Sequence, residues 1–556
     1  MSIIYQVPAI LHKHDIKRVV LSPGSRNAPL TISFARHTGF EKYIIPDERS
    51  AAFVALGMAQ TLNAPVVLVC TSGSAALNYA PAVAEAYFSN TPLLILTADR
   101  PPEWIDQQDG QTIRQQNLFG NHVRASFQLP VDTTHPDGAW EFGRKLNEAV
   151  HACKLHQGPV HVNIPFREPF YPKDDLTFDD ILPYIAFPKI SGASPEPFLS
   201  DFLKRIPAKV KILCVAGQGV PNEELNDIIP QLGIPVICEP LSNIGPSSNR
   251  IQKQDLFLGK LSSEQQAALK PDLLITWGAS VISKSLKQFI RTHKPLQHWH
   301  LSDSSQWADT YKSLSGVIQV SPVDFLHALV ETSYNKEYLN EWTELEEKAT
   351  IYTGKQLDAN QELTELNAFH TVLQHLSADS YVHVANSMPV RYLNLLGFSN
   401  NDEPVQVFCN RGTSGIDGAV STAMGCALST DKQVVLLTGD MSFFYDRNAW
   451  WHNYTCPNLK VIVFNNHGGG IFRMIDGPNG QPELEEYFVT RQKLTASHLA
   501  NEFDLNYFHA NNYDALKSQL HKLLNTSTQP SILEIETNGQ EDVATFQSFK
   551  KQFKLS

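Results

Sequence analysis

Short runs of β-branched and other apolar residues recur along the whole chain, and polar or helix-prone segments separate them. Runs of this composition are typical of strands buried on both faces of a sheet. Strands that alternate with helical segments predict βαβ units and parallel sheets. The runs lie at 18–21, 66–70, 93–97 and 160–165, then at 210–215, 234–238, 272–277 and 317–320, and finally at 381–385, 405–409, 434–438, 460–464 and 531–536.

This grouping predicts an α/β fold of three doubly wound domains with mainly parallel sheets. The segment 168–197 is rich in Pro, Asp and aromatic residues and lacks periodicity, so it is interpreted as a linker along the surface. The charged, helix-prone span 334–366 is interpreted as the second connection. We therefore expect domains at residues 1–180, 190–335 and 350–556.

Composition narrows the class of protein. The 556 residues are too many for one ordinary domain, and 42% apolar with 18% charged residues is a globular composition. Neither a membrane-spanning apolar run nor a signal peptide is predicted. The seven scattered cysteines contain no C-x-x-C pair, which favours reduced thiols in a cytoplasm over disulfides or a zinc site. The net charge of −12 argues against nucleic acid or an anionic membrane surface as the main partner.

Two apolar runs in the last third end in polar clusters that could share one site. Asp440 follows the run at 434–438, and Asn466 and Gly468 follow the run at 460–464. In a parallel sheet the carboxyl ends of neighbouring strands lie side by side, in the crevice where such sheets bind ligands. A carboxylate, an amide oxygen and a backbone carbonyl form a hard oxygen set that suits Mg²⁺. The alternative is two loops that need Asp, Asn and Gly only for turns.

Loops that follow predicted strands in the first third of the chain carry further candidate ligand-binding residues. Arg26 would project from a Ser-Pro-Gly-Ser-Arg turn, and Arg100 follows another strand, with Gln111 in the polar loop beyond it. Glu48 opens a predicted helix, a position that carboxylates also occupy simply because they favour the helix dipole. The loop 71–74 could bind an anion at a helix start or serve as a plain N-cap.

Two loops in the last third have similar features. Asn386 and Ser387 could cradle phosphate, and Arg391 lies one helical turn beyond Ser387. Three glycines in the segment 412–418 let the backbone pass close to a ligand, and Ile416 sits among them. In the middle domain a glycine loop faintly resembles a dinucleotide site, but Asn222 replaces the third glycine and the fingerprint fails.

Taken together, these motifs resemble one family, the 2-succinyl-5-enolpyruvyl-6-hydroxy-3-cyclohexene-1-carboxylate (SEPHCHC) synthases of menaquinone biosynthesis. The resemblance rests on SPGSRNAPL, DERSAAFVALGMAQ, TSGSAALNYAPAVAEA, TADRPP, NRGTSGIDG and GDMSFFYD…NNHGGGIF, and it covers nearly the whole chain. The Gly-Asp and Asn-Asn pairs also resemble the metal signature of thiamine diphosphate enzymes in general. Met441 stands where many of those enzymes have Gly.

The resemblance implies decarboxylation of 2-oxoglutarate and 1,4-addition of the resulting succinyl carbanion equivalent to isochorismate. The implied cofactors are thiamine diphosphate, which carries the difficult chemistry as an electron sink, and Mg²⁺ or Mn²⁺. The implied assembly is a homo-oligomer, a dimer or tetramer, with active sites between subunits. An isolated monomer should then not turn over.

The resemblance also assigns roles to matched residues. Asp440, Asn466 and the Gly468 carbonyl would hold the metal. Glu48, with a pKa raised by a dry pocket, would hydrogen-bond the aminopyrimidine ring and promote its imino tautomer, and Ile416 would wedge between the cofactor rings. Further residues that would line the cofactor are Asn386, Ser387, Ser414, Met441 and Ser442. The carboxylates of 2-oxoglutarate would contact Ser387, Arg391 and Arg411. Isochorismate would contact Ser25, Arg26, Arg100, Gln111 and Lys284, and the pocket would be walled by Ile471 and Phe472.

The residues provide a check on the implied substrates. Both are dianions, and an acidic protein that binds dianions must gather bidentate donors locally. Four arginines stand at or just beyond predicted strand ends: Arg26, Arg100, Arg391 and Arg411. Beside Lys284, Ser285 stands where some relatives have a second basic residue, so the isochorismate contact is less defined there.

Two rivals remain open. Another carboligase of the same class, such as an acetohydroxyacid synthase, acts on smaller monocarboxylates and should not need this many arginines. A non-catalytic protein with a binding or regulatory role is disfavoured because Glu48, Asp440 and Asn466 occur together.

Overall fold

Three parallel sheets organise the chain. The computed structural model describes residues 3–168, 170–172, 175–178, 182–186, 199, 203, 206–207, 209–302, 307–330, 335–398, 405–526 and 528–555. Its strands form three six-stranded sheets in which every strand pairing is parallel. The predicted fold class is confirmed. Much of the predicted linker falls outside the described residues, and the domain limits stay a prediction.

The first sheet has the order β2-β1-β3-β4-β6-β5. All four predicted runs are strands, while β2 and β5 were missed because their residues are mostly half-buried or exposed and form no apolar run. The strands are β1 (Arg18–Leu21), β2 (Glu41–Ile44), β3 (Val66–Cys70), β4 (Leu93–Asp99), β5 (Ala125–Gln128) and β6 (Val160–Pro165). The helices are α1 (Val7–Lys13), α2 (Ala28–Arg36), α3 (Glu48–Leu62), α4 (Ser74–Asn78), α5 (Ala80–Phe88) and α6 (Pro136–Leu155).

The second sheet has the order β12-β11-β10-β7-β8-β9, the strand order of dinucleotide-binding folds. Asn222, where the glycine fingerprint fails, caps α8 by accepting a 3.0 Å hydrogen bond from the Leu225 N–H. The strands are β7 (Ile212–Ala216), β8 (Val236–Cys238), β9 (Arg250–Ile251), β10 (Leu273–Trp277), β11 (Gln297–Leu301) and β12 (Gly316–Ile318). The helices are α8 (Glu223–Ile228), α9 (Gln254–Phe257), α10 (Ser263–Ala268), α11 (Lys284–Thr292) and α12 (Pro322–Val330).

The third sheet has the order β14-β13-β15-β16-β18-β17, which repeats the topology of the first when strands are counted within each domain. The predicted second connection contains a long helix, α13 (Lys336–Asp358). The strands are β13 (Tyr381–Val384), β14 (Gln406–Phe408), β15 (Val434–Gly439), β16 (Leu459–Asn465), β17 (Asn506–Ala510) and β18 (Ser531–Glu536). The further helices are α14 (Glu365–His375), α15 (Met388–Leu396), α16 (Ala419–Ala427), α17 (Asp440–Tyr445), α18 (Ala496–Glu502), α19 (Tyr513–Asn525) and α20 (Gly539–Gln552).

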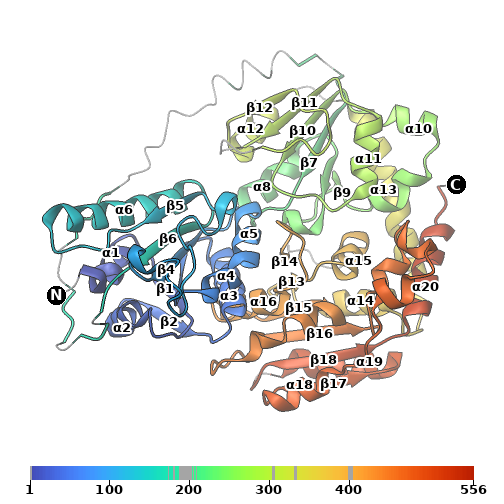
Figure 1. The fold of residues 1–556 in the computed structure, drawn as a ribbon. Helices are drawn as coiled ribbons and strands as arrows, with labels where there is room; N and C mark the ends of the chain where they lie inside the picture. The colour runs from blue at the N-terminus through green and yellow to red at the C-terminus, as the bar shows by residue number, and fades with distance from the viewer. Residues whose placement is uncertain are drawn as a thin grey trace.

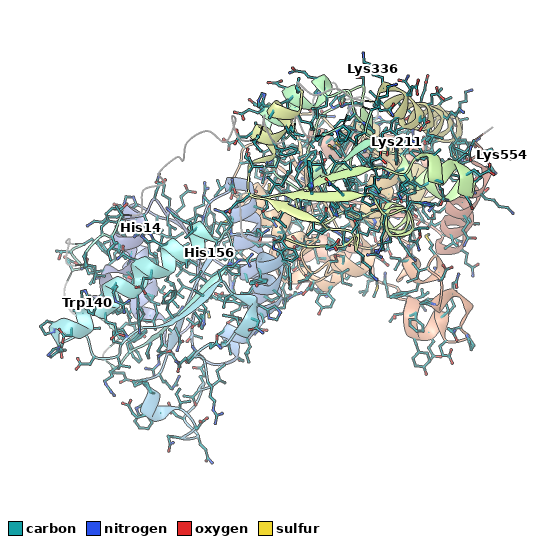
Figure 2. The ribbon with its side chains drawn as sticks, turned by 90° about the horizontal axis from the view of Figure 1, so that it is seen from above. His14, Trp140, His156, Lys211, Lys336 and Lys554 are labelled. Carbon is teal, nitrogen blue, oxygen red and sulfur yellow. The ribbon has the colours of Figure 1, made fainter. Side chains whose placement is uncertain are left out.

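The last domain contacts both of the others. Figure 1 shows the first domain at the left, with α3, α4 and α5 facing α16 of the last domain, and the central domain above. Seen from above, α6 runs along the outer side of the first domain between Trp140 and His156 (Figure 2). None of the helices in the described part of the chain is long and apolar enough to cross a membrane.

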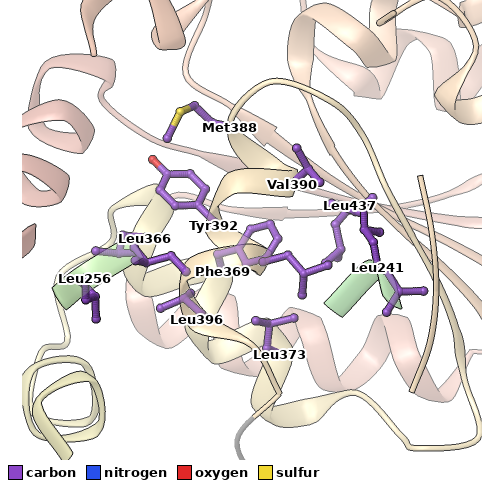
Figure 3. Close-up of a cluster of buried hydrophobic side chains, with 14 of the residues drawn as sticks. Leu241, Leu256, Leu366, Phe369, Leu373, Met388, Val390, Tyr392, Leu396 and Leu437 are labelled. Carbon is purple, nitrogen blue, oxygen red and sulfur yellow. The ribbon is translucent and has the colours of Figure 1, made fainter. Parts of the chain in front are cut away.

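A continuous apolar core joins the central and last domains. Leu241 and Leu256 of the central domain belong to the same buried cluster as Leu366, Phe369 and Tyr392 of α14 and α15, and Figure 3 shows these side chains together. Fully burying a side chain of this kind contributes about 1.5–3 kcal/mol. The two domains are therefore held as one body by their core.

The first and last domains meet through unusually close contact between α3 and α16. A Cβ on Gly57 would lie 1.9 Å from the carbonyl oxygen of Thr422, and one on Gly425 would lie 2.0 Å from the carbonyl oxygen of Val54. Each helix thus uses a glycine to accept the backbone of the other. The buried carboxylate of Glu85 adds to this contact by accepting hydrogen bonds of 2.8 and 2.6 Å from the backbone N–H groups of residues 412 and 413.

The substitution Gly57→Ala tests this contact. The added methyl group must push α3 and α16 apart, and overpacking of this kind costs about 1–3 kcal/mol. We expect a lowered apparent Tm in a thermal scan. Gly480→Ala is the matched control, because a Cβ there meets nothing within 4 Å. Equal Tm values for the two variants would contradict the proposed role of Gly57.

Candidate cofactor and substrate site

Asp440 lies where β15 meets α17, beside the end of β16. Residue Gly439 pairs with Phe464 in the parallel register, so the two polar loops predicted to meet are adjacent. The Asp440 carboxylate accepts 2.7 Å and 2.8 Å hydrogen bonds from Gln492 Nε2 and from the backbone N–H of residue 441. Burial raises its pKa to about 6, although hydrogen bonds from Gln492 and the backbone oppose the shift.

Asn466 completes this corner of the site. Its Nδ2 donates a 2.7 Å hydrogen bond to Glu365 Oε1, while its Oδ1 is buried and has no hydrogen-bond partner. The Gly468 carbonyl, the third predicted ligand, accepts a hydrogen bond from the backbone N–H of residue 470 and keeps a second lone pair. A buried amide oxygen without a donor, next to a buried carboxylate, fits a hard divalent cation.

The ligand set at this corner is mixed. Within the described ranges, no group of three or more His, Cys, Asp or Glu side chains could hold a metal. A cation here would therefore have one carboxylate and neutral oxygens from the protein and would need anionic ligands from a bound molecule. The diphosphate of a cofactor would supply them.

The two loops of the last domain are tied together by Asn386. Its Nδ2 donates to the carbonyl oxygens of Asn410 and Gly415 at 2.8 and 2.7 Å, and its Oδ1 accepts from Arg411 Nη1 at 2.9 Å. Ser442 Oγ donates to the Ile416 carbonyl oxygen at 2.9 Å. In this arrangement Asn386 shapes the loops around the predicted diphosphate site, and its contact with the diphosphate stays a prediction.

Other predicted cofactor residues lie on the same loops. Ser387 and Ser414 have positive φ values of 76° and 61°, a backbone conformation that non-glycine residues rarely adopt. Such strained positions cluster at ligand sites. Met441 is half-buried directly after Asp440. The structure thus brings the predicted cofactor residues of the last domain to one edge of its sheet.

Two arginines of the last domain lie close to one another. The Arg391 Nη1 donates to the Ser387 carbonyl oxygen at 2.5 Å, and the pKa of Arg391 is lowered by burial and by the charge of Arg411. Lys287 also has its pKa lowered by burial, with Arg411 among the charges that contribute. Lys284 is exposed at the start of α11, one turn before Lys287.

The second pair of arginines lies in the first domain. Arg26 stacks on the Phe170 ring, with its guanidinium carbon 4.5 Å from the centroid, and its pKa is lowered by burial and by Arg100. Arg100 donates to Ser72 Oγ at 2.8 Å and to the Gln111 carbonyl oxygen at 3.2 Å. The predicted residue Ser25, next to Arg26 in the sequence, is exposed, and so is Gln111. The structure therefore brings Arg26, Arg100 and Gln111 together.

Glu48 is the first residue of α3 and is half-buried. Burial raises its pKa, and the neighbouring charge of Asp47 adds to the shift. Cys70 and Tyr79 lie close enough to Glu48 that its negative charge raises the pKa of each. Both effects favour the protonated form of this carboxyl group relative to an exposed glutamate.

Glu48 and Asp440 belong to separate groups within one chain. Among the described residues, no hydrogen bond or ion pair joins Glu48 to the residues around Asp440. Arg49, next to Glu48, instead donates to the Asp417 and Tyr445 carbonyl oxygens at 2.7 and 3.2 Å.

The predicted wall residues follow shortly after Asn466 and Gly468, two of the predicted metal ligands, in the sequence. Ile471 and Phe472 are half-buried in the short 3-10 helix η8 (Gly470–Arg473). The Phe472 ring packs against the Phe488 ring at 5.7 Å between centroids, and Phe488 belongs to the following turn, η10 (Leu484–Val489). Arg473 fastens this segment through paired 2.8 Å hydrogen bonds to Glu485.

Comparison with known proteins defines the class first. Three family models match in order: "Thiamine pyrophosphate enzyme, N-terminal TPP binding domain" over residues 3–119, "Middle domain of thiamine pyrophosphate" over 211–384, and "Thiamine pyrophosphate enzyme, C-terminal TPP binding domain" over 393–535. The fold and these matches define a three-domain thiamine diphosphate enzyme.

Curated relatives give the particular family. A 2-succinyl-5-enolpyruvyl-6-hydroxy-3-cyclohexene-1-carboxylate synthase of Cytophaga hutchinsonii is 44% identical, with 100% of each chain covered. Synthases of the same name from Flavobacterium johnsoniae (38% identical, 96% of each chain) and Porphyromonas gingivalis (37% identical, 96% of this chain and 94% of the relative) are also similar. The chain belongs to the SEPHCHC synthase family.

Four residues around the site escaped the sequence analysis. Glu365 and Gln492 hold the two proposed metal ligands, and Glu85 holds the loop of Arg411. Each reaches its partner from a distant part of the chain. Glu85 stands in the motif TSGSAALNYAPAVAEA, but the motif does not indicate its partner, and neither Glu365 nor Gln492 stands in one of the quoted motifs. Lys287 had a signal in the sequence, because it lies three residues after Lys284 and on the same face of a predicted helix.

The raised pKa of Asp440 predicts how cation binding depends on pH. Below pH 6 a proton competes for the carboxylate, so the affinity for Mn²⁺ in the presence of thiamine diphosphate should fall about tenfold per pH unit. Free Mn²⁺ can be measured by electron paramagnetic resonance between pH 5 and pH 7. The cofactor phosphate titrates in the same range, so Asp440→Asn is the control: it should bind more weakly and lose part of this slope. Identical slopes would show that Asp440 is not the competing group.

Proposed function

We propose that this protein is a SEPHCHC synthase that removes CO₂ from 2-oxoglutarate and joins the succinyl remainder to isochorismate by 1,4-addition. It would use thiamine diphosphate together with Mg²⁺ or Mn²⁺. Family membership supports this activity, because the full-length relatives carry its name. The observation on which the choice of substrates rests is the presence of two close arginine pairs at two sheet edges.

The arginine pairs suit dianionic substrates. Like charges at short range are costly, and each pair contains an arginine whose pKa is lowered by burial and by its partner, although nearby carboxylates oppose the shift. In the first pair Arg100 Nε donates a 2.5 Å hydrogen bond to Asp109, so isochorismate would bind beside that ion pair. Bidentate guanidinium groups match carboxylates in geometry as well as charge. Arg391 and Arg411 would hold the two carboxylates of 2-oxoglutarate, and Arg26 and Arg100 would hold isochorismate.

The protein would position and protect the reacting groups. Thiamine diphosphate, when bound, supplies an electron sink for the decarboxylated substrate. Asp440, Asn466 and the Gly468 carbonyl would fix its diphosphate through the cation. Glu48 would hold and return a proton at the aminopyrimidine ring, a task that its raised pKa suits. Ile471 and Phe472 would keep water from the reacting carbon.

The proposed assembly is a homodimer, or a tetramer built from such dimers, with active sites between subunits. Glu48 and the first arginine pair would face Asp440 and Asn466 of a second copy. The family resemblance supports this proposal, and among the described residues no hydrogen bond or ion pair joins Glu48 to Asp440.

The proposed reaction predicts a clear substrate preference. Purified protein with thiamine diphosphate, Mg²⁺, 2-oxoglutarate and isochorismate should consume isochorismate, followed by its absorbance. Pyruvate in place of 2-oxoglutarate should fail, because it lacks the second carboxylate that an arginine would bind. Equal rates with pyruvate would contradict the substrate assignment and favour a monocarboxylate carboligase.

The same assay tests the assignment of Arg391 to the carboxylates of 2-oxoglutarate. Arg391→Gln should raise KM for 2-oxoglutarate at least about tenfold, because a charge-assisted hydrogen bond is worth about 1.5–3 kcal/mol. Arg447→Gln removes an exposed arginine that pairs with Glu502 and should leave KM unchanged. An unchanged KM in both variants would remove Arg391 from the substrate site.

A further inference from the structure

A buried carboxylate contacts Asn466, one of the residues proposed to bind the metal ion. Glu365, the first residue of α14, is 3% exposed. Its Oε1 accepts a 2.7 Å hydrogen bond from Asn466 Nδ2, and its Oε2 accepts a 3.1 Å hydrogen bond from the Tyr392 hydroxyl. Figure 3 shows Tyr392 within the core beside Leu366, the residue that follows Glu365. The carboxylate therefore links the apolar core to the site.

The position of Glu365 is itself fixed. Its backbone N–H donates to Asp542 Oδ1 at 2.7 Å, and the other oxygen of Asp542 accepts from Thr537 Oγ1 at 2.7 Å. Both Asp542 and Thr537 are buried. A continuous chain of hydrogen bonds thus runs from Thr537 through Asp542 and the start of α14 to the amide of Asn466.

This chain determines which way the Asn466 amide faces. The Asn466 amide presents its NH₂ group to Glu365 Oε1, while the Tyr392 hydroxyl donates to Oε2. The amide oxygen then points to the opposite side, where Oδ1 is buried without a donor. In the reversed orientation Oδ1 would lie against Glu365 Oε1, and the NH₂ group would face the proposed metal site.

The charges around Glu365 also fit a nearby cation. Burial, together with the negative charges of Asp542 and Asp440, raises the pKa of Glu365 well above its usual value. Burying a carboxylate is costly, and an apolar residue of similar volume often packs at least as well. A divalent cation bound at Asp440 and Asn466 would offset this accumulation of negative charge.

We propose that Glu365 is a positioning residue that holds the Asn466 amide with its oxygen toward the metal ion. This inference rests on the proposed metal site at Asp440 and Asn466. Glu365 does not touch the cation; it acts only through the orientation of Asn466. Partners of this kind around metal ligands commonly change metal affinity when they are replaced.

The test measures Mn²⁺ binding by electron paramagnetic resonance in the presence of saturating thiamine diphosphate. Glu365→Leu removes the acceptor and should weaken Mn²⁺ binding about 10- to 100-fold. Glu365→Gln should stay within about threefold of wild type, because its carbonyl oxygen can accept from Asn466 while its NH₂ group donates to the Tyr392 oxygen. Tyr392→Phe is the matched control: it removes the other hydrogen bond to Glu365 and should leave Mn²⁺ affinity nearly unchanged.

A double variant separates positioning from a general structural effect. If Glu365 acts through Asn466, Glu365→Leu combined with Asn466→Ala should bind Mn²⁺ no more weakly than Asn466→Ala alone. Additive losses would overturn the inference, as would a tenfold loss in Glu365→Gln or in Tyr392→Phe. If the Leu variant does not fold, as judged by circular dichroism, Glu365→Met removes the acceptor in the same way and should give the same loss of Mn²⁺ affinity.

The inference and the proposed function fail in different ways. If the wild-type protein with thiamine diphosphate binds no more Mn²⁺ than the cofactor binds in buffer, the proposed metal site itself is wrong. If the wild type binds Mn²⁺ and Glu365→Leu binds it equally well, only the role of Glu365 is wrong.

Discussion

The close contact between α3 and α16 is the constraint on which the arrangement of the site depends. Gly57 and Gly425 let each helix accept the backbone of the other, and no residue with a side chain fits in either place. This contact fixes the first domain against the last within one chain. It also brings Glu85 to the loop of Arg411, so the loop that carries a proposed substrate ligand is held by a carboxylate from the neighbouring domain.

The same contact sets where Glu48 and Asp440 lie within one chain. Glu48 begins α3 and Asp440 begins α17, and Arg49, next to Glu48, donates to the carbonyl oxygens of Asp417 and of Tyr445, the last residue of α17. In the proposed assembly a second copy would complete the active site. Each arginine pair would then bind one substrate, and the two pairs would face one another across the subunit boundary.

Much of the fold could be predicted from the sequence, because strands buried on both faces leave long apolar runs. Two edge strands leave no such run: β2 is exposed or half-buried, and β17 has only one fully buried residue. The edge strands β12 and β14 were predicted. At the site, Asp440 and Asn466 could be predicted to meet because parallel strands place their carboxyl ends together. Glu365 and Gln492 could not, because their hydrogen bonds to these ligands cross long stretches of chain and no local pattern specifies them. The saturation of Asn386 by protein partners was likewise invisible in the sequence.

A working site is proposed to combine Glu48 of one chain with Asp440 of another, and mixed oligomers distinguish this arrangement from a site within one chain. Glu48→Gln and Asp440→Ala, each inactive alone, can be co-expressed with different tags and purified as heterodimers. A site shared between subunits restores one intact site per heterodimer, so about half of the wild-type turnover should return. If both halves belong to one chain, every site in the heterodimer is damaged, and an inactive heterodimer would contradict the account.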